Sequence, residues 1–485
     1  MSKFSSRWGM MLAMLGMAVG TGNIWRFPRI AASNGGGSFL VAWVVFLLVW
    51  SIPLILVEFA MGRETRYGAV GAFSRLVGRK FAWMGAWIAW TATAIMFYYT
   101  VVMGWTIRYF WGALSGELAG AEPGVVWEGF AWGPQVLGFH ALAMLLAAWV
   151  VAKGVKGIER AASILIPSLF VLVVILTIRA VTLPGAVDGL NFLFTPTWEG
   201  LTDHRVWLNA LTQNAWDTGA GWGLILTYAI YMRKNEDTTL NAFMLGFGNN
   251  GVSLLAGILV LCTVFSIMPD AANEIVGAGN EGLTFIWVPQ LFNAMPAGRF
   301  FMTLFFLALM FAAWSSLISM IELATRVLVD GGLARRKALM IVAGAGFVLG
   351  VPAALDQAWF QNQDWVWGVG LMVSGLFFAI AVLKYGVTRF REELINTEHA
   401  DIRIGRWWDW AIRLVVVQAV ILVVWWISQF GVDDVWGRYG IWNTLAQWAV
   451  AIGFFLTLNR WMVRGTHPEV ERAEAPGGGE PPSGS

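Results

Sequence analysis

The stretch Gly16-Met-Ala-Val-Gly-Thr-Gly-Asn-Ile-Trp-Arg-Phe-Pro28 lies inside the first long apolar segment of the chain and interrupts it. A second stretch, Asp217-Thr-Gly-Ala-Gly-Trp-Gly223, interrupts the sixth apolar segment. Glycine costs about 1 kcal/mol relative to alanine inside a helix, so these glycines favour unwinding. Close helix packing through small residues is the alternative for glycines alone, but charged residues lie in the same breaks. Unwound backbone at membrane depth needs protein or a water-filled cavity around it. Paired breaks therefore indicate a transporter's binding site near the bilayer midplane.

Composition indicates a membrane protein. Of the 485 residues, 58% are hydrophobic and only 13% are charged, whereas soluble domains average about 25% charged residues. So few charges cannot cover a water-soluble protein of this size, which excludes a soluble enzyme, and the hydrophobic content excludes intrinsic disorder. The net charge of +2 gives no basic field, so we expect no nucleic-acid partner. The single cysteine, Cys262, excludes an internal disulfide framework.

A membrane-spanning helix needs about 20 mostly apolar residues. We predict an all-α polytopic membrane protein with a single transmembrane domain, residues 1–464, followed by a disordered cytoplasmic tail, 465–485, that is rich in glycine and proline. The two breaks fall in spans 1 and 6, which are matching positions of two five-helix halves. Spans 1 to 12 are predicted at 10–33, 37–61, 83–112, 135–153, 161–183, 206–232, 239–268, 298–329, 338–355, 366–388, 405–430 and 441–463.

The distribution of lysine and arginine predicts the orientation of the spans. Lys3 and Arg7 precede span 1, and basic clusters follow spans 2, 4, 6, 8 and 10, whereas residues 114–134 contain no lysine or arginine. Basic residues favour the cytoplasmic loops. We therefore expect a multi-pass protein of the cell's inner (plasma) membrane with both termini in the cytoplasm.

Several motifs occur in a characteristic order along the chain. The stretch 16–28 is followed by Asn34-Gly-Gly-Gly-Ser-Phe39, Glu58-Phe-Ala-Met-Gly-Arg63, Lys156-Gly-Ile-Glu-Arg160, Asp188-Gly-Leu-Asn-Phe192, and Ser315-Ser316 before Glu322. Together these motifs resemble the signature of the neurotransmitter:sodium symporters. The resemblance implies the leucine-transporter fold, with spans 1–5 and 6–10 as inverted repeats, spans 11 and 12 as accessory helices, and spans 1 and 6 unwound. It also implies sodium-coupled symport of an amino acid by alternating access.

The resemblance further implies where the substrate binds. The amides of Thr21 and Gly22 and the Tyr99 hydroxyl are expected to bind its carboxylate, and carbonyls near Ala18 and Trp216 to face its ammonium. Gly20 stands where family members that carry monoamines have an aspartate, so it leaves room for a carboxylate. The residues expected to surround the substrate side chain are Ile95, Tyr99, Trp216, Gly219, Trp222, Ser316 and Met320.

None of these residues would pair with a charged side chain, so we predict a neutral amino acid. Gly219 together with Trp222 resembles the glycine transporters of the family, which favours a small substrate. Further unwinding of glycine-rich span 6 is the alternative, and it would admit leucine or an aromatic side chain.

Two sodium sites are implied by the same resemblance, and sodium prefers hard oxygen ligands. The substrate carboxylate is expected to complete the first site, so that sodium and substrate raise each other's affinity. Serine pairs in membrane helices also bond back to their own helix, which is the alternative role for Ser315 and Ser316. The first site maps to the Ala18 carbonyl, Asn23, Asp217 and Asn249, and the second to the carbonyls of Gly16, Val19 and Ala312 with the hydroxyls of Ser315 and Ser316.

Asp217 departs from the family pattern, which has serine or threonine at this position. Ser253 and Gln213 match chloride-binding members, but Trp43 replaces a tyrosine that normally contacts chloride. Because an ionisable residue at the bilayer centre costs roughly 2.5–3.5 kcal/mol, it is normally functional. We predict that ionised Asp217 supplies the negative charge and that chloride is not required. Protonation of Asp217 during return of the empty carrier, giving proton antiport, is a rival or additional role.

Two gates are implied by analogy. Arg26 and Asp364, which precedes the predicted span 10, are expected to pair, directly or through water, above Trp216, and Tyr231 and Asp330 match a cytoplasmic gate. The usual N-terminal arginine and tryptophan are not reproduced. Phe4 replaces the tryptophan and Lys3 is the one nearby substitute cation.

Other functional classes remain as alternatives. A sodium-dependent sensor would bind the amino acid without transporting it, and a proton-coupled transporter of the same fold would not need sodium. A channel is disfavoured by two gates and by bulky Trp216 and Trp222. No nucleophile triad, phosphate loop or metalloprotease motif occurs, so we predict no enzymatic activity. The sequence does not predict the oligomeric state.

Overall fold

Long apolar helices account for most of the predicted spans. The computed structural model describes residues 3–398, 400–430 and 434–464, so the predicted tail 465–485 lies outside the described residues. Nine stretches of the described chain are helices long and apolar enough to cross a membrane. They are α3–α4 with the π-turn η2 between them (Gly37–Thr65), η3–α6 (Arg79–Ser115), α9 (Gly154–Val181), α14 (Thr238–Ile267), α18 (Gly298–Asp330), α19 (Arg335–Leu355), α20 (Gln357–Tyr385), α22 (Trp407–Ser428) and α23 (Ile441–Arg464).

The other three predicted spans are also present. Span 4 is the shorter apolar helix α8 (Val136–Ala152). Span 1 is divided into α1 (Arg7–Ala18), the π-turn η1 (Gly22–Arg26) and α2 (Phe27–Ser33), and span 6 into α12 (His204–Asp217) and α13 (Leu224–Ala229). The prediction of twelve helical spans, with the first and sixth broken, is therefore confirmed.

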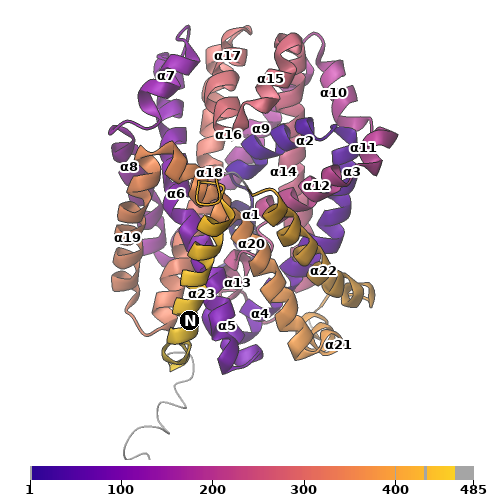
Figure 1. Ribbon diagram of the computed structural model, residues 1–485, viewed down its shortest axis with the longest axis vertical. Helices are drawn as coiled ribbons and strands as arrows, with labels where there is room; N and C mark the ends of the chain where they lie inside the picture. Colours follow the sequence, from indigo (N-terminus) through magenta and orange to yellow (C-terminus); the bar gives the residue numbers. More distant parts are fainter. Residues whose placement is uncertain (1–2, 399, 431–433, 465–485) are drawn as a thin grey trace, which may run out of the picture.

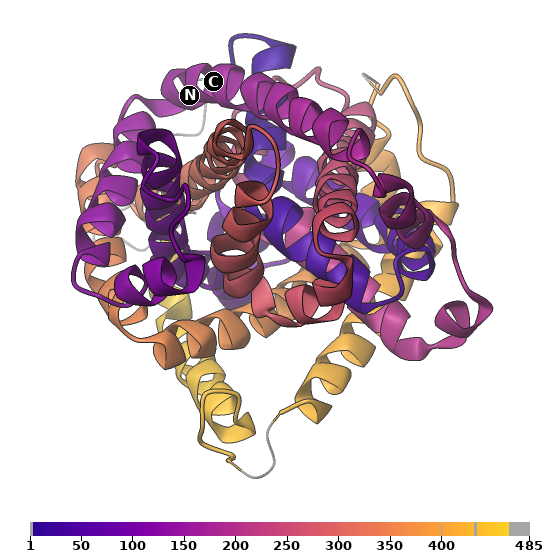
Figure 2. The ribbon, with the colours of Figure 1, turned by 90° about the horizontal axis from the view of Figure 1, so that it is seen from above.

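Both ends of the described chain lie at the same end of the bundle (Figure 1). That end also carries α5 (Ala69–Leu76) and α21 (Val387–Phe390). Viewed from above, α22 and α23 stand at the outer edge of the bundle (Figure 2). The opposite end carries short helices: α7 (Pro123–Phe130), α10 (Ala186–Phe194), α11 (Trp198–Thr202), α15 (Ala272–Gly277), α16 (Gly279–Glu281) and α17 (Val288–Asn293).

The break in span 1 follows from an extended residue. Val19 has φ −73° and ψ 107°, which ends α1, and the chain resumes helical turns at Gly22. The Asn23 side chain accepts a hydrogen bond from the Gly20 amide at 2.8 Å. A backbone N–H that the break releases is therefore satisfied by a side chain three residues further along the same sequence motif.

The break in span 6 requires its glycines. Gly219, Gly221 and Gly223 have φ of 70°, 88° and 78°. Residues with a Cβ rarely adopt this left-handed region, whereas glycine does so without strain. Three left-handed residues in five positions cannot continue a right-handed helix, so α12 ends at Asp217 and α13 starts at Leu224.

A buried carboxylate holds the span 6 break in place. Glu58 of α4 is fully buried and accepts hydrogen bonds from the Gly221 amide at 2.7 Å and from the Leu226 amide at 3.1 Å. Both donors belong to the region where the helical ladder is interrupted. Glu58 thus replaces the lost helical acceptors from a neighbouring helix.

Two predicted boundaries are wrong. Span 5 starts at Gly154 rather than at 161, and span 10 starts at Gln357 rather than at 366, so Asp364 lies inside α20 instead of before it. The Asp356 side chain caps α20 by accepting from the Trp359 amide at 2.6 Å. The first turns of α20 are polar and bond to α23, so hydropathy does not detect them.

We predict that Glu58→Ala lowers the melting temperature of the purified protein. The change leaves the amides of Gly221 and Leu226 buried without an acceptor, at about 1–3 kcal/mol for each group. Differential scanning fluorimetry in detergent measures the shift. Glu64→Ala is the matched control, since Glu64 is exposed on the same helix. Equal melting of Glu58→Ala and the unmodified protein would contradict this role.

Candidate functional site

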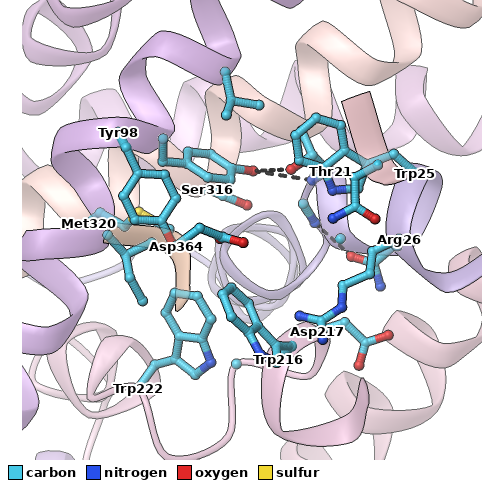
Figure 3. A pocket seen from close by; sticks show the side chains of 18 of the residues that line it. Thr21, Trp25, Arg26, Tyr98, Trp216, Asp217, Trp222, Ser316, Met320 and Asp364 are labelled. Carbon is cyan, nitrogen blue, oxygen red and sulfur yellow. Dashed lines mark hydrogen bonds between the residues drawn. The ribbon is translucent and has the colours of Figure 1, made fainter. Parts of the chain in front are cut away.

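The two breaks meet at a central cavity. The cavity has a volume of about 80 Å³ and is lined from α1, η1, α6, α18, α20 and the link between α12 and α13 (Figure 3). All the residues expected to surround the substrate line it. They are Ala18, Gly20, Thr21, Gly22, Ile95, Tyr99, Trp216, Gly219, Trp222, Ser316 and Met320.

Tyr99 anchors the break of span 1. Its hydroxyl accepts hydrogen bonds from the Thr21 amide at 3.1 Å and from the Thr21 hydroxyl at 3.2 Å. A Cβ on Gly20 would lie 2.8 Å from Ser316 Oγ and 3.0 Å from this hydroxyl. The glycine therefore keeps a small polar space open between α1 and α18. A hydroxyl and backbone amides facing such a space can bind a carboxylate.

Two indoles form the opposite wall of the cavity. The rings of Trp216 and Trp222 pack edge to face with centroids 6.2 Å apart. Trp222 Nε1 donates to the Ala215 carbonyl at 3.1 Å, which fixes the indole against the end of α12. A Cβ on Gly219 would lie 3.1 Å from Met17 Sδ. This wall is apolar, and fixed in position by a hydrogen bond.

Asp217 lies at the centre of a buried polar cluster. Its Oδ2 accepts from Gln213 Nε2 at 3.1 Å and from Ser253 Oγ at 3.2 Å. Asn23 Nδ2 donates to Ser253 Oγ at 2.8 Å and to Asn249 Oδ1 at 3.0 Å. The structure thus brings together the side chains assigned to the first sodium site and those assigned to charge compensation.

The other oxygen of Asp217 is unpaired. Asp217 Oδ1 is buried and has no hydrogen-bond partner among the described residues. A buried, unpaired carboxylate oxygen is costly unless a cation or donor reaches it. The cluster of Asp217, Gln213, Ser253, Asn23 and Asn249 contains carboxylate, amide and hydroxyl groups and no thiolate or imidazole, so this oxygen suits a hard cation.

The second group of expected ligands lies between α1 and α18. Ser316 Oγ donates to the Val19 carbonyl at 3.2 Å and to the Met17 carbonyl at 3.4 Å. Ser315 Oγ donates to the Ala312 carbonyl at 3.0 Å, so Ser315 bonds back to its own helix. A Cβ on Gly16 would lie 3.2 Å from the Ser315 Cβ. Both hydroxyls keep lone pairs after donating, so the alternative role of the serine pair and a ligand role are compatible.

Arg26 and Asp364 both line the outer part of the cavity. The Arg26 guanidinium carbon lies 4.5 Å from the centroid of the Trp216 ring, in a cation–π contact. Arg26 and Asp364 form no direct ion pair in the part of the chain that the structure describes, and Tyr98 lies beside Asp364 (Figure 3). The two residues therefore face one cavity without a direct ion pair, and their pairing through water stays a prediction.

Sequence reasoning missed the contribution of a loop to this outer part. Asn280 and Glu281 of α16 line the cavity, and Asn280 Oδ1 accepts from Arg29 Nε at 2.8 Å. Burial raises the pKa of the Glu281 carboxyl. No pattern in the loop indicates which residue reaches the cavity. Further lining residues that the sequence did not indicate are Met17, Trp25, Tyr98, Val102, Leu224 and Phe360.

At the end of the bundle that carries the termini, the two expected gate residues bond to different partners. The Tyr231 hydroxyl donates to Glu322 Oε1 at 2.6 Å. Asp330 instead forms an ion pair with Arg326 at 2.6 Å and accepts from the Gly68 amide at 2.6 Å. Tyr231 and Asp330 therefore belong to two neighbouring networks.

Glu322 carries an ion pair that the sequence did not reveal. The residue is fully buried, and Arg335 donates hydrogen bonds to both of its carboxylate oxygens, at 2.9 Å and 2.5 Å. Arg335 also donates to the Val151 carbonyl at 3.0 Å. The pair joins α18 to the start of α19, and Tyr231 joins both to the end of the span 6 segment.

The N-terminal segment contacts the same region, but it does so without the arginine that the family usually has there. Lys3 is exposed, whereas Phe4 is buried and packs edge to face on Tyr228 and Tyr231 at centroid distances of 6.2 Å and 6.3 Å. Glu159 of α9 accepts from the Ser5 amide and hydroxyl at 2.9 Å and 2.6 Å. Phe4 and Ser5 thus hold the segment onto the bundle by aromatic packing and hydrogen bonds.

Several known proteins are similar to this chain in sequence or in fold. The family model described as "Sodium:neurotransmitter symporter family" matches residues 1–130 and 134–469. An uncharacterized sodium-dependent transporter of Methanocaldococcus jannaschii is 32% identical over 446 residues, which cover 87% of this chain and 89% of that protein. Another, of Bacillus subtilis, is 31% identical over 443 residues, covering 87% and 96%. The crystal structure of MhsT in complex with L-phenylalanine superposes with a TM-score of 0.78 at 30% identity, covering 87% of this chain and 99% of that one.

We predict that Arg335→Ala destabilises the protein by about 3–5 kcal/mol, because it leaves the Glu322 carboxylate buried without its cation. Chemical or thermal denaturation in detergent measures the loss. The double variant Arg335→Ala/Glu322→Gln is expected to recover part of it, since no uncompensated charge remains. Arg336→Ala, at the exposed neighbouring position, serves as control. If the Arg335→Ala and Arg336→Ala variants have the same melting temperature, the ion pair does not stabilise the protein.

Proposed function

Because the chain belongs to the sodium:neurotransmitter symporter family and has the leucine-transporter fold, we propose that it carries a small neutral amino acid into the cell with two sodium ions, by alternating access and without chloride. The family consists of sodium-dependent transporters rather than enzymes. In this proposal the protein spans the plasma membrane with both termini in the cytoplasm. Basic clusters after the even-numbered spans support that orientation.

One observation carries the proposal: the two helix breaks meet at one cavity that has an anion-binding side and a cation-binding side. The Tyr99 hydroxyl accepts from the Thr21 amide and hydroxyl and keeps its own proton to donate to a carboxylate. Asp217 Oδ1 offers an unpaired carboxylate oxygen to a cation. A zwitterion with sodium beside its carboxylate satisfies both sides at once.

Coupling between substrate and sodium follows from their shared contact. The substrate carboxylate completes the coordination of the first sodium ion beside Asn23, Asp217 and Asn249. Each ligand then raises the affinity of the other by the same factor. The second ion, between Val19 and Ser315–Ser316, ties α1 to α18.

Asp217 takes the place of chloride in this scheme. Asp217 Oδ2 is 3.2 Å from Ser253 Oγ, so a carboxylate on α12 occupies the space beside the α14 serine. Its negative charge balances a sodium ion in a medium that screens charge poorly. An additional chloride would lie against this carboxylate, and like charges repel.

The gates have different strengths. On the outer side, Arg26 stacks on Trp216 and faces Asp364 without a direct bond, so it can move when substrate enters. On the inner side, the Glu322–Arg335 pair, the Tyr231 hydroxyl and the N-terminal contacts of Phe4 and Ser5 close the exit. The described arrangement fits a carrier closed toward the cytoplasm.

The small-substrate proposal rests on Trp222. Its indole is held by the Ala215 carbonyl and occupies the wall that a longer substrate side chain would need. MhsT, the structural neighbour, holds L-phenylalanine. We assign the smaller preference of this chain to the fixed indole beside Gly219.

We predict that uptake into proteoliposomes stops when choline replaces sodium and continues unchanged when gluconate replaces chloride. The physical reason is that Asp217 supplies the anionic charge from within the protein. Radiolabelled glycine or alanine flux measures both. Full activity in choline would contradict sodium coupling, and binding without accumulation would contradict transport.

We predict further that Asp217→Ser makes uptake chloride-dependent. The double variant Asp217→Ser/Ser253→Asp is the matched test, because it returns one carboxylate to the same space from α14. We expect the double variant to regain chloride independence. A single variant that transports equally well in gluconate would show that Asp217 does not replace chloride.

We predict that Trp222→Ala admits phenylalanine, since removal of the indole enlarges the cavity beside Gly219. Competition by a panel of neutral amino acids against labelled alanine measures the change. We expect phenylalanine to compete at least about tenfold better, or about 1.4 kcal/mol, and alanine to lose affinity. Trp198→Ala, at a position that is 80% exposed, is the control. An unchanged order of competitors would contradict the role of Trp222.

A further inference from the structure

A second cavity, larger than the first, opens at the periphery of the bundle. It has a volume of about 650 Å³ and lies between α6, α19, α20 and α23, at the end of the bundle opposite the termini. Tyr98 is the one described residue that lines both cavities. The polar residues that line the second cavity are Asp356, Asn362, Gln363, Arg438, Asn443 and Gln447.

An apolar groove continues from this cavity toward the other end of the bundle. The groove has a volume of about 290 Å³ and shares Trp90, Phe97 and Leu349 with the cavity. From Asn443 in the cavity to Met462 in the groove, α23 advances about 28 Å at 1.5 Å per residue. That distance approaches the thickness of a hydrocarbon core, about 30 Å. Cavity and groove together therefore have room for a whole acyl chain that enters from the leaflet opposite the termini.

The surroundings of the groove face the bilayer. Val450 and Phe454 of α23 are 74% and 58% exposed, and Leu349 of α19 is exposed as well. Both helices stand at the edge of the bundle (Figures 1 and 2). Exposed apolar side chains on a membrane-spanning helix contact lipid tails, so a tail is the natural neighbour of this groove.

The polar end has the chemistry of a headgroup site. Asn362, Gln363, Asn443 and Gln447 bond to one another, for example Gln447 Nε2 to Asn443 Oδ1 at 2.7 Å, and form a fixed amide floor. Arg438 Nη1 donates to Gln361 Oε1 at 2.7 Å, which leaves the other guanidinium N–H groups for an anion.

A charge of opposite sign completes the headgroup site. Asp356 Oδ1 caps α20 through the Trp359 amide, which leaves its second oxygen for a cation. The cavity therefore presents one cationic and one anionic side chain above an apolar groove. A phosphate beside a primary ammonium, joined to acyl chains, complements this arrangement.

We propose that this groove binds one phosphatidylethanolamine molecule from the leaflet opposite the termini. Arg438 binds the phosphate, Asp356 binds the ammonium, and one acyl chain lies along Trp90, Phe97 and Leu349. Phosphatidylcholine cannot donate an N–H to Asp356, and phosphatidylglycerol places no cation beside it. The proposal is independent of the transported substrate.

Native mass spectrometry of the full chain tests the lipid proposal. The protein is stripped of lipid and titrated with phosphatidylethanolamine, phosphatidylcholine or phosphatidylglycerol of identical acyl chains. One charge-assisted hydrogen bond corresponds to about tenfold in affinity. We expect phosphatidylethanolamine to be retained about tenfold better than the other two. Asp356→Asn keeps the helix cap and should abolish this preference, and Arg438→Gln should weaken all three lipids.

Two further variants complete the test. Ala345→Phe, in the apolar groove, should reduce retention of every lipid, and Arg205→Gln, an exposed arginine at the same end of the bundle, should change nothing. Equal retention of the three lipids, or headgroup variants that behave like the unmodified protein, would overturn the proposal. A dimer that excludes the lipid would assign the groove to a second copy of the chain instead.

Discussion

Backbone hydrogen bonding in a medium without water is the constraint on which this structure depends. Each helix break releases N–H groups that the bilayer cannot satisfy. Side chains from elsewhere satisfy them: Asn23 bonds the Gly20 amide, Tyr99 the Thr21 amide, and Glu58 the amides of Gly221 and Leu226. The breaks therefore persist as defined structures rather than as loose segments, and the groups left over form the binding cavity.

The buried carboxylates illustrate the difference between support and binding. Glu58 is satisfied by two backbone amides and Glu322 by an arginine and a tyrosine. Asp217 has donors on one oxygen and none on the other among the described residues. Protein interiors rarely leave such an atom unpaired. Its position beside Asn23 and Asn249 is the physical basis for the proposed first sodium site.

Local sequence was sufficient for the spans and the breaks, because hydropathy and glycine act over a few residues. Composition and spacing predict twelve spans with breaks within 16–28 and 217–223, and the structure interrupts the helices at 19–21 and 218–223. Pairings between distant segments do not. Glu58 with Gly221, and Glu322 with Arg335, join residues whose individual patterns carry no signal for a partner. The polar start of α20 was not predicted for a related reason. Its Asn and Gln side chains form hydrogen bonds with α23, and hydropathy carries no information about such partners.

The residues lining the central cavity were predictable where a family motif marked them. Thr21, Tyr99, Trp216 and Ser316 lie together as the motifs indicated. Asn280 and Glu281 reach the cavity from a loop whose conformation depends on contacts with α2, such as Arg29 with Asn280. Loop residues of this kind become recognisable only when the helices that support them are placed.

The Glu322–Arg335 pair has a consequence for fidelity. Separating these charges inside the protein is unfavourable unless water enters at the same moment. In the proposed cycle, opening the carrier toward the cytoplasm therefore starts with a rise in free energy, whether the central cavity is empty or filled. The binding free energy of substrate and sodium can offset that rise. A carrier that is empty or binds only one of them lacks most of this binding free energy. A lock of this kind suppresses futile turnover, and it would let the cell keep its ion gradient when the nutrient is scarce.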